Sequence, residues 1–153
     1  MKSILLVDDE ENICVKLQGM LQGFGYHVEV AHTSESALSW FGKSHLDVIV
    51  VEFNLRSEDP AQPRTGNGIR LVRQIHALET SVPILMYTAM EGEFYETTSF
   101  EAGVDEFILK TQSLSSFLSR LQVHLCRLAQ QRGGGKTRQS MAILGLRTVG
   151  SSI

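Results

Sequence analysis

The sequence predicts an α/β fold in which a five-stranded parallel sheet is covered by helices on both faces. Short apolar segments with the character of buried strands alternate with helical patterns five times along the chain. Polar residues directly follow several of these strands, at the edge where open α/β sheets bind their ligands. The length of 153 residues fits a single domain.

The strands are predicted from continuous or alternating apolar runs. The first run ends in Asp8 and Asp9, and the third continues directly into Glu52. After their first residues, Ser3 and Asp47, both runs are apolar at every position, as expected for strands that are buried on two faces. The five predicted strands are residues 3–7, 26–31, 47–51, 83–87 and 106–109.

The helices are predicted from apolar residues that recur every three or four positions. Gly23 and Gly25 end the first helix, Thr33 or Ser34 caps the second, and Gly103 ends the fourth. The last helix begins after Ser113 and carries one apolar stripe, formed by Leu114, Phe117, Leu118, Leu121, Leu125 and Leu128. The five helical segments are residues 13–21, 34–41, 69–75, 93–102 and 114–128.

Two segments interrupt this alternation. Residues 56–67 are polar and contain two of the three prolines, which indicates an extended loop. A passive surface insertion is the favoured interpretation of this loop, ahead of a gate or a partner-binding segment. Residues 131–153 begin near three glycines and are predicted to form a flexible, basic tail or the start of a linker, with a short helix at 141–146.

Composition excludes several classes of protein. No apolar run approaches the roughly 18 residues that span a bilayer, and the N-terminal run is too short for a signal peptide. The two cysteines and five histidines have no metal-ligand spacing, so we expect a reduced, cytoplasmic protein without a zinc site. Gly133-Gly-Gly-Lys-Thr resembles the end of a phosphate-binding loop, but no strand precedes it.

Candidate chemistry stands at the ends of the predicted strands. Asp8, Asp9 and Glu52 would meet at one edge of the sheet, where clustered carboxylates favour a hard cation such as Mg²⁺. Thr88 and Lys110 follow the fourth and fifth strands, and a hydroxyl and an ammonium there suit the oxygens of a phosphoryl group. Each residue alone fits a turn, a cap or a solvated charge, whereas the ordered set favours a functional site.

Four segments carry a resemblance to a known family. They are Leu-Leu-Val-Asp-Asp-Glu, Asp-Val-Ile-Val-Val-Glu-Phe-Asn-Leu, Ile-Leu-Met-Tyr-Thr-Ala and Ala-Gly-Val-Asp-Glu-Phe-Ile-Leu-Lys. At this spacing, residues 1–130 resemble the receiver domain of bacterial response regulators, the modules of two-component and phosphorelay signal transduction. The resemblance implies a flavodoxin-like, doubly wound sheet of order 2-1-3-4-5 with five helices, and no enzymatic activity of the chain's own.

The resemblance also implies roles for single residues. Asp8, Asp9 and the residue at position 52 would hold Mg²⁺, together with the backbone carbonyl of Asn54. Thr88 would be the switch hydroxyl and Lys110 the phosphate-sensing lysine. Phe107 would be the aromatic residue that changes rotamer on activation.

Three departures from the family pattern affect these roles. Glu52 stands where the phosphate-accepting aspartate is expected, so the chain resembles a pseudo-receiver, and we expect Glu52 to weaken Mg²⁺ binding. The loop over residues 56–67 is longer than usual by about eight residues. Thr111 replaces a proline that commonly follows the lysine, and we expect this change to place Lys110 less firmly.

We expect Glu52 to pair with Lys110 and to imitate a phosphorylated site in part, because glutamate reaches one methylene further than aspartate. The main alternative is a receiver that a histidine kinase still phosphorylates on Glu52 with Mg²⁺. A Mg²⁺-dependent phosphohydrolase with Asp8 as the nucleophile is a third and weaker hypothesis.

Partners are expected to be proteins, either a histidine kinase or a downstream effector. By resemblance, the surface of the fourth helix, fifth strand and fifth helix would bind them or form a homodimer. Tyr95 and Phe100 are candidate contacts, although the pattern favours core packing of Phe100 at least as strongly. We expect no membrane contact, and no nucleic-acid contact for this chain alone, because the four basic residues after position 131 make a weak patch. The chain is expected to be either a stand-alone receiver or part of a longer regulator.

Overall fold

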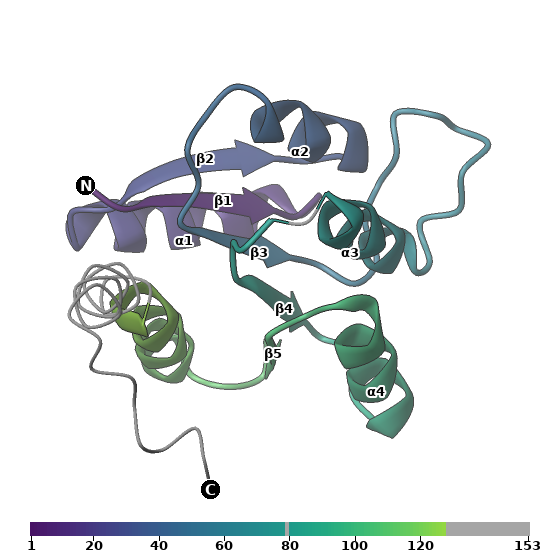
Figure 1. Ribbon diagram of the computed structural model, residues 1–153. Helices are drawn as coiled ribbons and strands as arrows, with labels where there is room; N and C mark the ends of the chain where they lie inside the picture. The colour runs from purple at the N-terminus through teal and green to yellow at the C-terminus, as the bar shows by residue number, and fades with distance from the viewer. Residues whose placement is uncertain (79, 128–153) are drawn as a thin grey trace, which may run out of the picture.

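Five parallel strands form one sheet through the centre of the molecule (Figure 1). The computed structural model describes residues 1–78 and 80–127. The sheet order is β2-β1-β3-β4-β5, and all four pairings are parallel. This order confirms the predicted doubly wound, flavodoxin-like topology. The strands are β1 (Ser3–Val7), β2 (His27–Ala31), β3 (Val48–Val51), β4 (Ile84–Thr88) and β5 (Glu106–Leu109).

Helices connect each strand to the next and cover both faces of the sheet. They are α1 (Glu11–Gly23), α2 (Ser34–Phe41), α3 (Asn67–Ala77) and α4 (Glu93–Ala102). A fifth helix begins at residue 114 and continues to 127, where the second described range ends. Within the described ranges, no helix is long and apolar enough to cross a membrane. The predicted tail over 131–153 and the last position of the apolar stripe, Leu128, lie outside the described residues.

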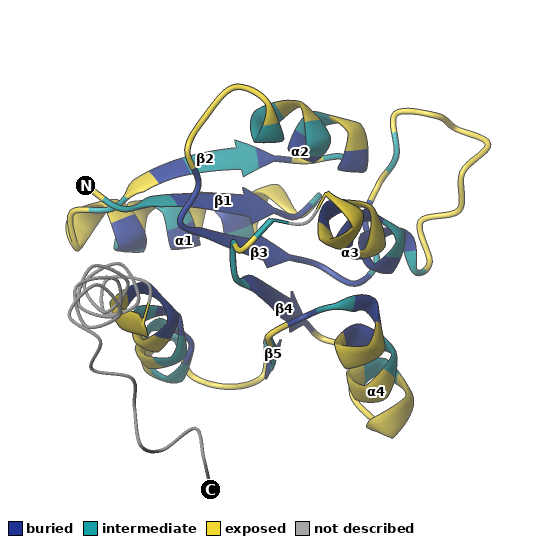
Figure 2. Ribbon diagram, in the orientation of Figure 1, coloured by how far each residue is buried: buried dark blue, intermediate teal, exposed yellow. Residues whose placement is uncertain are grey.

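The core consists of two apolar layers, one on each face of the sheet. In β1, Leu5 and Val7 contribute to one layer, and Ile4 and Leu6 to the other, as the alternation of side chains along a strand requires. The first layer includes residues of α2, α3 and α4, and the second includes residues of α1 and the fifth helix. Figure 2 shows the buried sides of the helices turned toward the buried strands. Burial on both faces explains why β1, β3 and β4 read as continuous apolar runs.

The boundaries of two helices follow from local contacts. Thr33 caps α2 as predicted, because its side chain accepts a hydrogen bond from the amide of Ser36 at 3.1 Å. The predicted loop over 56–67 is one residue too long, since α3 begins at Asn67. Gly66 precedes it with a φ of 72°, and the buried Asn67 side chain donates to the carbonyl oxygen of Leu55 at 2.9 Å.

The start of α3 touches the backbone of the two residues that follow β3, Glu52 and Phe53. The amide of Gly68 donates to the carbonyl oxygen of Phe53 at 2.9 Å. A Cβ atom at position 68 would lie 1.8 Å from the carbonyl oxygen of Glu52 and 2.8 Å from that of Phe53. Only glycine permits this approach of helix to strand. Position 68 therefore fixes the backbone on which Glu52 is carried.

We predict that Gly68→Ala destabilises the fold by about 1–3 kcal/mol, because backbone rather than a flexible side chain would have to move. Gly19→Ala is the matched control: Gly19 lies inside α1, and nothing is within 4 Å of the added methyl group. There alanine is expected to stabilise by about 0.5–1 kcal/mol. Urea unfolding measures both changes, and a Gly68→Ala variant as stable as the parent would contradict the close contact.

Candidate functional site

The ammonium group of Lys110, just after β5, lies between two buried carboxylates. Its Nζ is 2.8 Å from Oδ2 of Asp8 and 2.5 Å from Oε2 of Glu52. The side chains of Asp8, Glu52 and Lys110 are only about 10% exposed. Oε2 of Glu10 lies further away, at 3.7 Å. The structure thus brings together three residues that the sequence places at the ends of three different strands.

The remaining oxygens of the two buried carboxylates accept hydrogen bonds from the backbone. Oε1 of Glu52 accepts from the amide of Phe53 at 2.7 Å and, more weakly, from that of Asn54 at 3.4 Å. Oδ1 of Asp8 accepts from the amide of Glu10 at 2.9 Å. Both carboxylates are therefore fixed by their own strand end on one side and by Lys110 on the other.

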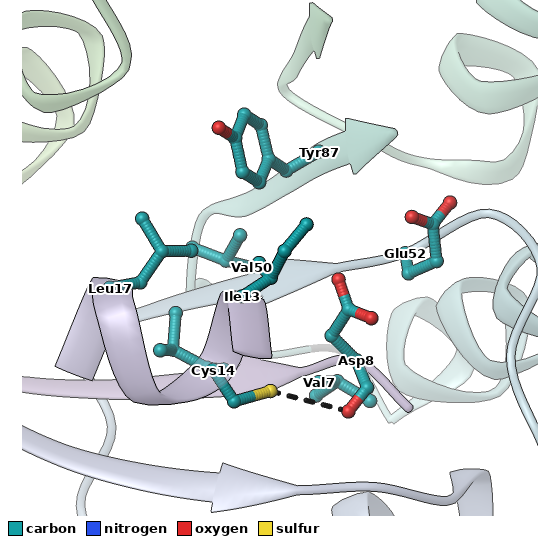
Figure 3. A pocket seen from close by; sticks show the side chains of 9 residues that line it. Val7, Asp8, Ile13, Cys14, Leu17, Val50, Glu52 and Tyr87 are labelled. Atoms are coloured by element: carbon teal, nitrogen blue, oxygen red, sulfur yellow. Dashed lines mark hydrogen bonds between the residues drawn. The ribbon is translucent and has the colours of Figure 1, made fainter. Parts of the chain in front are cut away.

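Beneath these carboxylates lies a cavity of about 10 Å³. In Figure 3 the carboxyl groups of Asp8 and Glu52 lie at one end of it, and the apolar side chains of Leu17 and Val50 at the other. This volume is about that of one water probe. The thiol of Cys14 closes the adjacent side and contacts the carbonyl oxygen of Asp8 at 3.4 Å. The charged groups therefore stand directly on the apolar core.

Burial and pairing shift the acidity of these groups. Burial raises the pKa of Asp8, and the hydrogen bonds from Lys110 and the Glu10 amide only partly offset it. Burial alone would lower the pKa of Lys110, but the carboxylates of Asp8 and Glu52 outweigh it and raise that pKa. Burial, and then the charge of Asp8, raise the pKa of the Cys14 thiol to about 12, so that this thiol is protonated at neutral pH.

Asp9 belongs to a separate contact. Its Oδ1 lies 2.7 Å from Nη2 of Arg64, and its Oδ2 accepts from the backbone amide of Arg56 at 2.9 Å. The Asp9 side chain is 1% exposed, whereas that of Arg64 is 65% exposed. Both contacts come from the loop between β3 and α3. Of the acidic pair after β1, Asp8 thus bonds to Lys110 and Asp9 to the loop.

The same loop is bound to α2 and α3. Glu35 of α2 accepts from the Ser57 hydroxyl at 2.5 Å and from the Glu58 amide at 2.9 Å. Arg70 of α3 donates to the Gln62 side chain at 2.8 Å and to the carbonyl oxygen of Pro63 at 3.1 Å. These contacts attach an exposed loop, seen beside α2 and α3 in Figure 2, to the rest of the domain.

Two other predicted site residues, Asn54 and Thr88, border a second, open cavity of about 400 Å³. Thr88 lines it, and its hydroxyl oxygen accepts from the Met90 amide at 3.2 Å. The Asn54 side-chain oxygen accepts from the Gly66 amide at 3.0 Å. Phe107 lies apart, half-buried on the face of β5. The cavity is lined by Glu10, Glu52, Asn54, Arg64, Thr65, Thr88, Ala89, Met90 and Lys110.

The carboxylates at the predicted metal site already have partners. Each oxygen of Asp8, Asp9 and Glu52 has a donor from the chain itself, as described above. Among the described residues, no group of three or more His, Cys, Asp or Glu side chains is arranged to hold a metal ion. A metal ion held by Asp8, Asp9, Glu52 and Asn54 remains a prediction, and this arrangement as it stands does not fit one.

Sequence reasoning missed two residues of this region, Arg64 and Glu35. Both act through contacts with residues far away in the chain, and both depend on the path of the loop. The signal for these contacts in the sequence is the polarity of residues 56–66, which form the loop that supplies Arg64 and the partner of Glu35.

A family model for the response regulator receiver domain matches residues 4–122. The chain belongs to this family. It is a receiver domain of the two-component type, and receiver domains interact with histidine kinases and effector domains and typically bind Mg²⁺ at their acidic pocket. The homologues are response regulators, which signal rather than act as enzymes.

Relatives and solved structures agree with this assignment. The chain is 34% identical over 126 residues to the alkaline phosphatase synthesis transcriptional regulatory protein PhoP of Bacillus subtilis, covering 82% of the chain and 49% of that protein. It is 33% identical to the non-phosphorylated HemR receiver domain of Leptospira biflexa, with a TM-score of 0.70, covering 82% of the chain and 94% of that domain. A CheY-like receiver domain of Methanospirillum hungatei shares the fold at 24% identity and a TM-score of 0.74, covering 86% and 98% of the two chains. The chain spans about half the length of several curated relatives that it matches.

We predict that Asp8→Asn stabilises the domain at pH 7, since Lys110 keeps Glu52 as an ionic partner in this variant. A carboxyl group whose folded pKa is raised contributes most to stability below its unfolded value of about 4. That contribution is lost as the pH rises through the folded pKa, and asparagine avoids this loss. Asp9→Asn is the control and is expected to destabilise, since it removes the ionic partner of Arg64. Urea unfolding at several pH values separates the two, and equal effects of both substitutions would contradict the assignment.

We predict that Glu35 stays ionised on mild acidification. The hydrogen bond from Ser57, together with those from the backbone, lowers its pKa to about 2 and outweighs the opposing effect of burial. Its stabilising contribution is then present above the unfolded pKa and lost as the pH falls toward 2. In an NMR titration, the side-chain carboxyl carbon signal of Glu35 should barely move between pH 6 and pH 3.5. A midpoint near the ordinary glutamate value would refute this, and Glu35→Gln should remove the titration altogether.

Proposed function

We propose that this chain is a receiver module that signals by protein–protein contact, with Glu52 as a fixed and partial substitute for a phosphoryl group. The observation that carries the proposal is the 2.5 Å contact between Oε2 of Glu52 and Nζ of Lys110. Lys110 matches the lysine that senses the phosphoryl group in the family, and here a carboxylate occupies that partner's place.

The chemistry of glutamate supports this role but limits it. The additional methylene carries the carboxylate further into the pocket than an aspartate would. Glutamate supplies a charge of −1 and two oxygens, whereas a phosphoryl group supplies about −2 and three oxygens. One oxygen bonds to Lys110 and the other to the amide of Phe53, and the Thr88 hydroxyl bonds to the Met90 amide. Of the two groups that would respond to a phosphoryl group, Thr88 and Lys110, Glu52 therefore contacts Lys110.

The surface of α4, β5 and the fifth helix is the proposed output face. A groove of about 670 Å³ crosses it, and its lining includes Phe100, Phe107 and Arg120. Phe100 is 46% exposed and Phe94 is 69% exposed, which leaves aromatic area for a partner. Tyr95, in contrast, packs edge-on against Phe53. We propose that a histidine kinase, a downstream effector or a second copy of the chain binds here.

The competing proposal is a receiver that is phosphorylated on Glu52 by a histidine kinase with Mg²⁺. It is favoured by the open cavity beside Glu52, which Thr88 and Lys110 also line. The phosphohydrolase hypothesis gains no such support, because Asp8 lines the small cavity of about 10 Å³ and is not among the residues that line the open one.

We predict that Glu52→Gln shifts the amide NMR signals of Thr88, Phe107 and α4, because the neutral amide cannot pair with Lys110 by charge. Glu10→Gln is the matched control. It removes the same charge from a side chain that is 3.7 Å from the same ammonium but is 55% exposed. If the amide signals of α4 and β5 shift only in Glu52→Gln, the result supports Glu52 as a fixed substitute for a phosphoryl group. Equal signal shifts in the two variants, or no shifts in either, contradict this role.

Intact mass after incubation with acetyl phosphate and Mg²⁺ distinguishes the two proposals. The fixed substitute predicts no covalent phosphate on the wild-type chain. A gain of one phosphate that Glu52→Gln abolishes would overturn it and establish the competing proposal.

A further inference from the structure

Backbone hydrogen bonds join the two ends of the loop between β3 and α3. The amide of Leu55 donates to the carbonyl oxygen of Arg64 at 3.2 Å, which joins the two ends of the loop. The Asn67 amide donates to the same carbonyl oxygen at 3.2 Å, and the Gly66 amide bonds to Asn54. The backbone of Arg64 is therefore fixed at the base of the loop, beside α3.

Both ends of the closed loop then contact one carboxylate. Arg56, at the start of the loop, gives its backbone amide to Oδ2 of Asp9, and Arg64, at its end, gives its guanidinium to Oδ1. The Asp9 side chain is left with an exposed fraction of 1%, while the Arg64 side chain is 65% exposed and lines the open cavity beside Glu52. The guanidinium thus covers the carboxylate from the side of the cavity.

Charge explains why a cation is needed at this point. Asp8, Asp9, Glu10 and Glu52 place four carboxylates around the ends of β1 and β3, and Lys110 contacts only three of them. Asp9 is the remaining one, and a buried carboxylate without a cation is costly. In the family this charge is met by a divalent ion. In this chain a side chain from the additional loop meets it.

We propose that Arg64 takes the place of the divalent cation at Asp9, so that metal binding at the acidic pair requires the Arg64–Asp9 contact to open. The lengthened loop is then a strap that supplies a cation from within the chain. This inference does not rest on Glu52 acting as a phosphate substitute, because it concerns a different carboxylate and a different cation.

Electron paramagnetic resonance of Mn²⁺, used as a probe for divalent ions, tests the proposal directly. Removing a charge-assisted hydrogen bond should favour the metal by about ten-fold. We therefore expect Arg64→Gln to bind Mn²⁺ about ten-fold more tightly than the wild-type chain. Arg56→Gln is the matched control, because Arg56 belongs to the same loop and contacts Asp9 through its backbone amide. It should bind Mn²⁺ as the wild type does.

Adding Asp9→Asn to Arg64→Gln should abolish the gain. Equal affinities of Arg64→Gln and wild type would overturn the proposal, as would a gain that survives Asp9→Asn. A measurement on the wild type alone makes the test independent of variant folding. During a Mg²⁺ titration, the side-chain Nε–H signal of Arg64 should move with the metal-binding curve while that of Arg56 does not. Metal binding that leaves the Arg64 signal unmoved would also refute the exchange.

Neither readout uses phosphorylation or a partner. Failure of the Glu52 proposal would leave these Mn²⁺ affinities unchanged, so the two inferences can fail separately.

Discussion

The ammonium group of Lys110 joins the ends of three strands. Its contacts with Asp8 and Glu52 connect β5 to β1 and β3, at the edge where the parallel sheet brings its carboxyl ends together. Without this cation, two buried carboxylates would face each other on top of an apolar core, an arrangement that costs several kcal/mol. The position of Glu52, the acidity of Asp8 and the packing beneath them all depend on this one group.

A second cation divides the acidic residues into two groups. Arg64 holds Asp9 at the loop, while Lys110 holds Asp8 and Glu52 at the centre of the site. Receiver domains typically bind Mg²⁺ at this acidic pocket, and in the proposed exchange Arg64 takes the place of that ion at Asp9. Charge balance, more than the identity of any single acid, therefore accounts for how the site is built.

Much of this architecture could be predicted from the sequence because it rests on local patterns. Buried parallel strands give apolar runs, and parallel topology carries Asp8, Glu52, Thr88 and Lys110 to one edge. The Arg64–Asp9 contact spans 55 residues and depends on how an irregular loop folds back, so no periodicity reports it. The weak apolar pattern of α4 likewise left open which of its aromatic residues is exposed.

The contact between Gly68 and β3 has a consequence for the reach of Glu52. Because α3 presses against the carbonyl oxygen of Glu52 without an intervening side chain, the backbone there has little freedom to withdraw. A longer side chain at this position cannot be compensated by retreat of the strand. The additional methylene of Glu52 therefore displaces its carboxylate by its full length. The packing of α3 on one face of the sheet thus determines how far this carboxylate extends into the pocket.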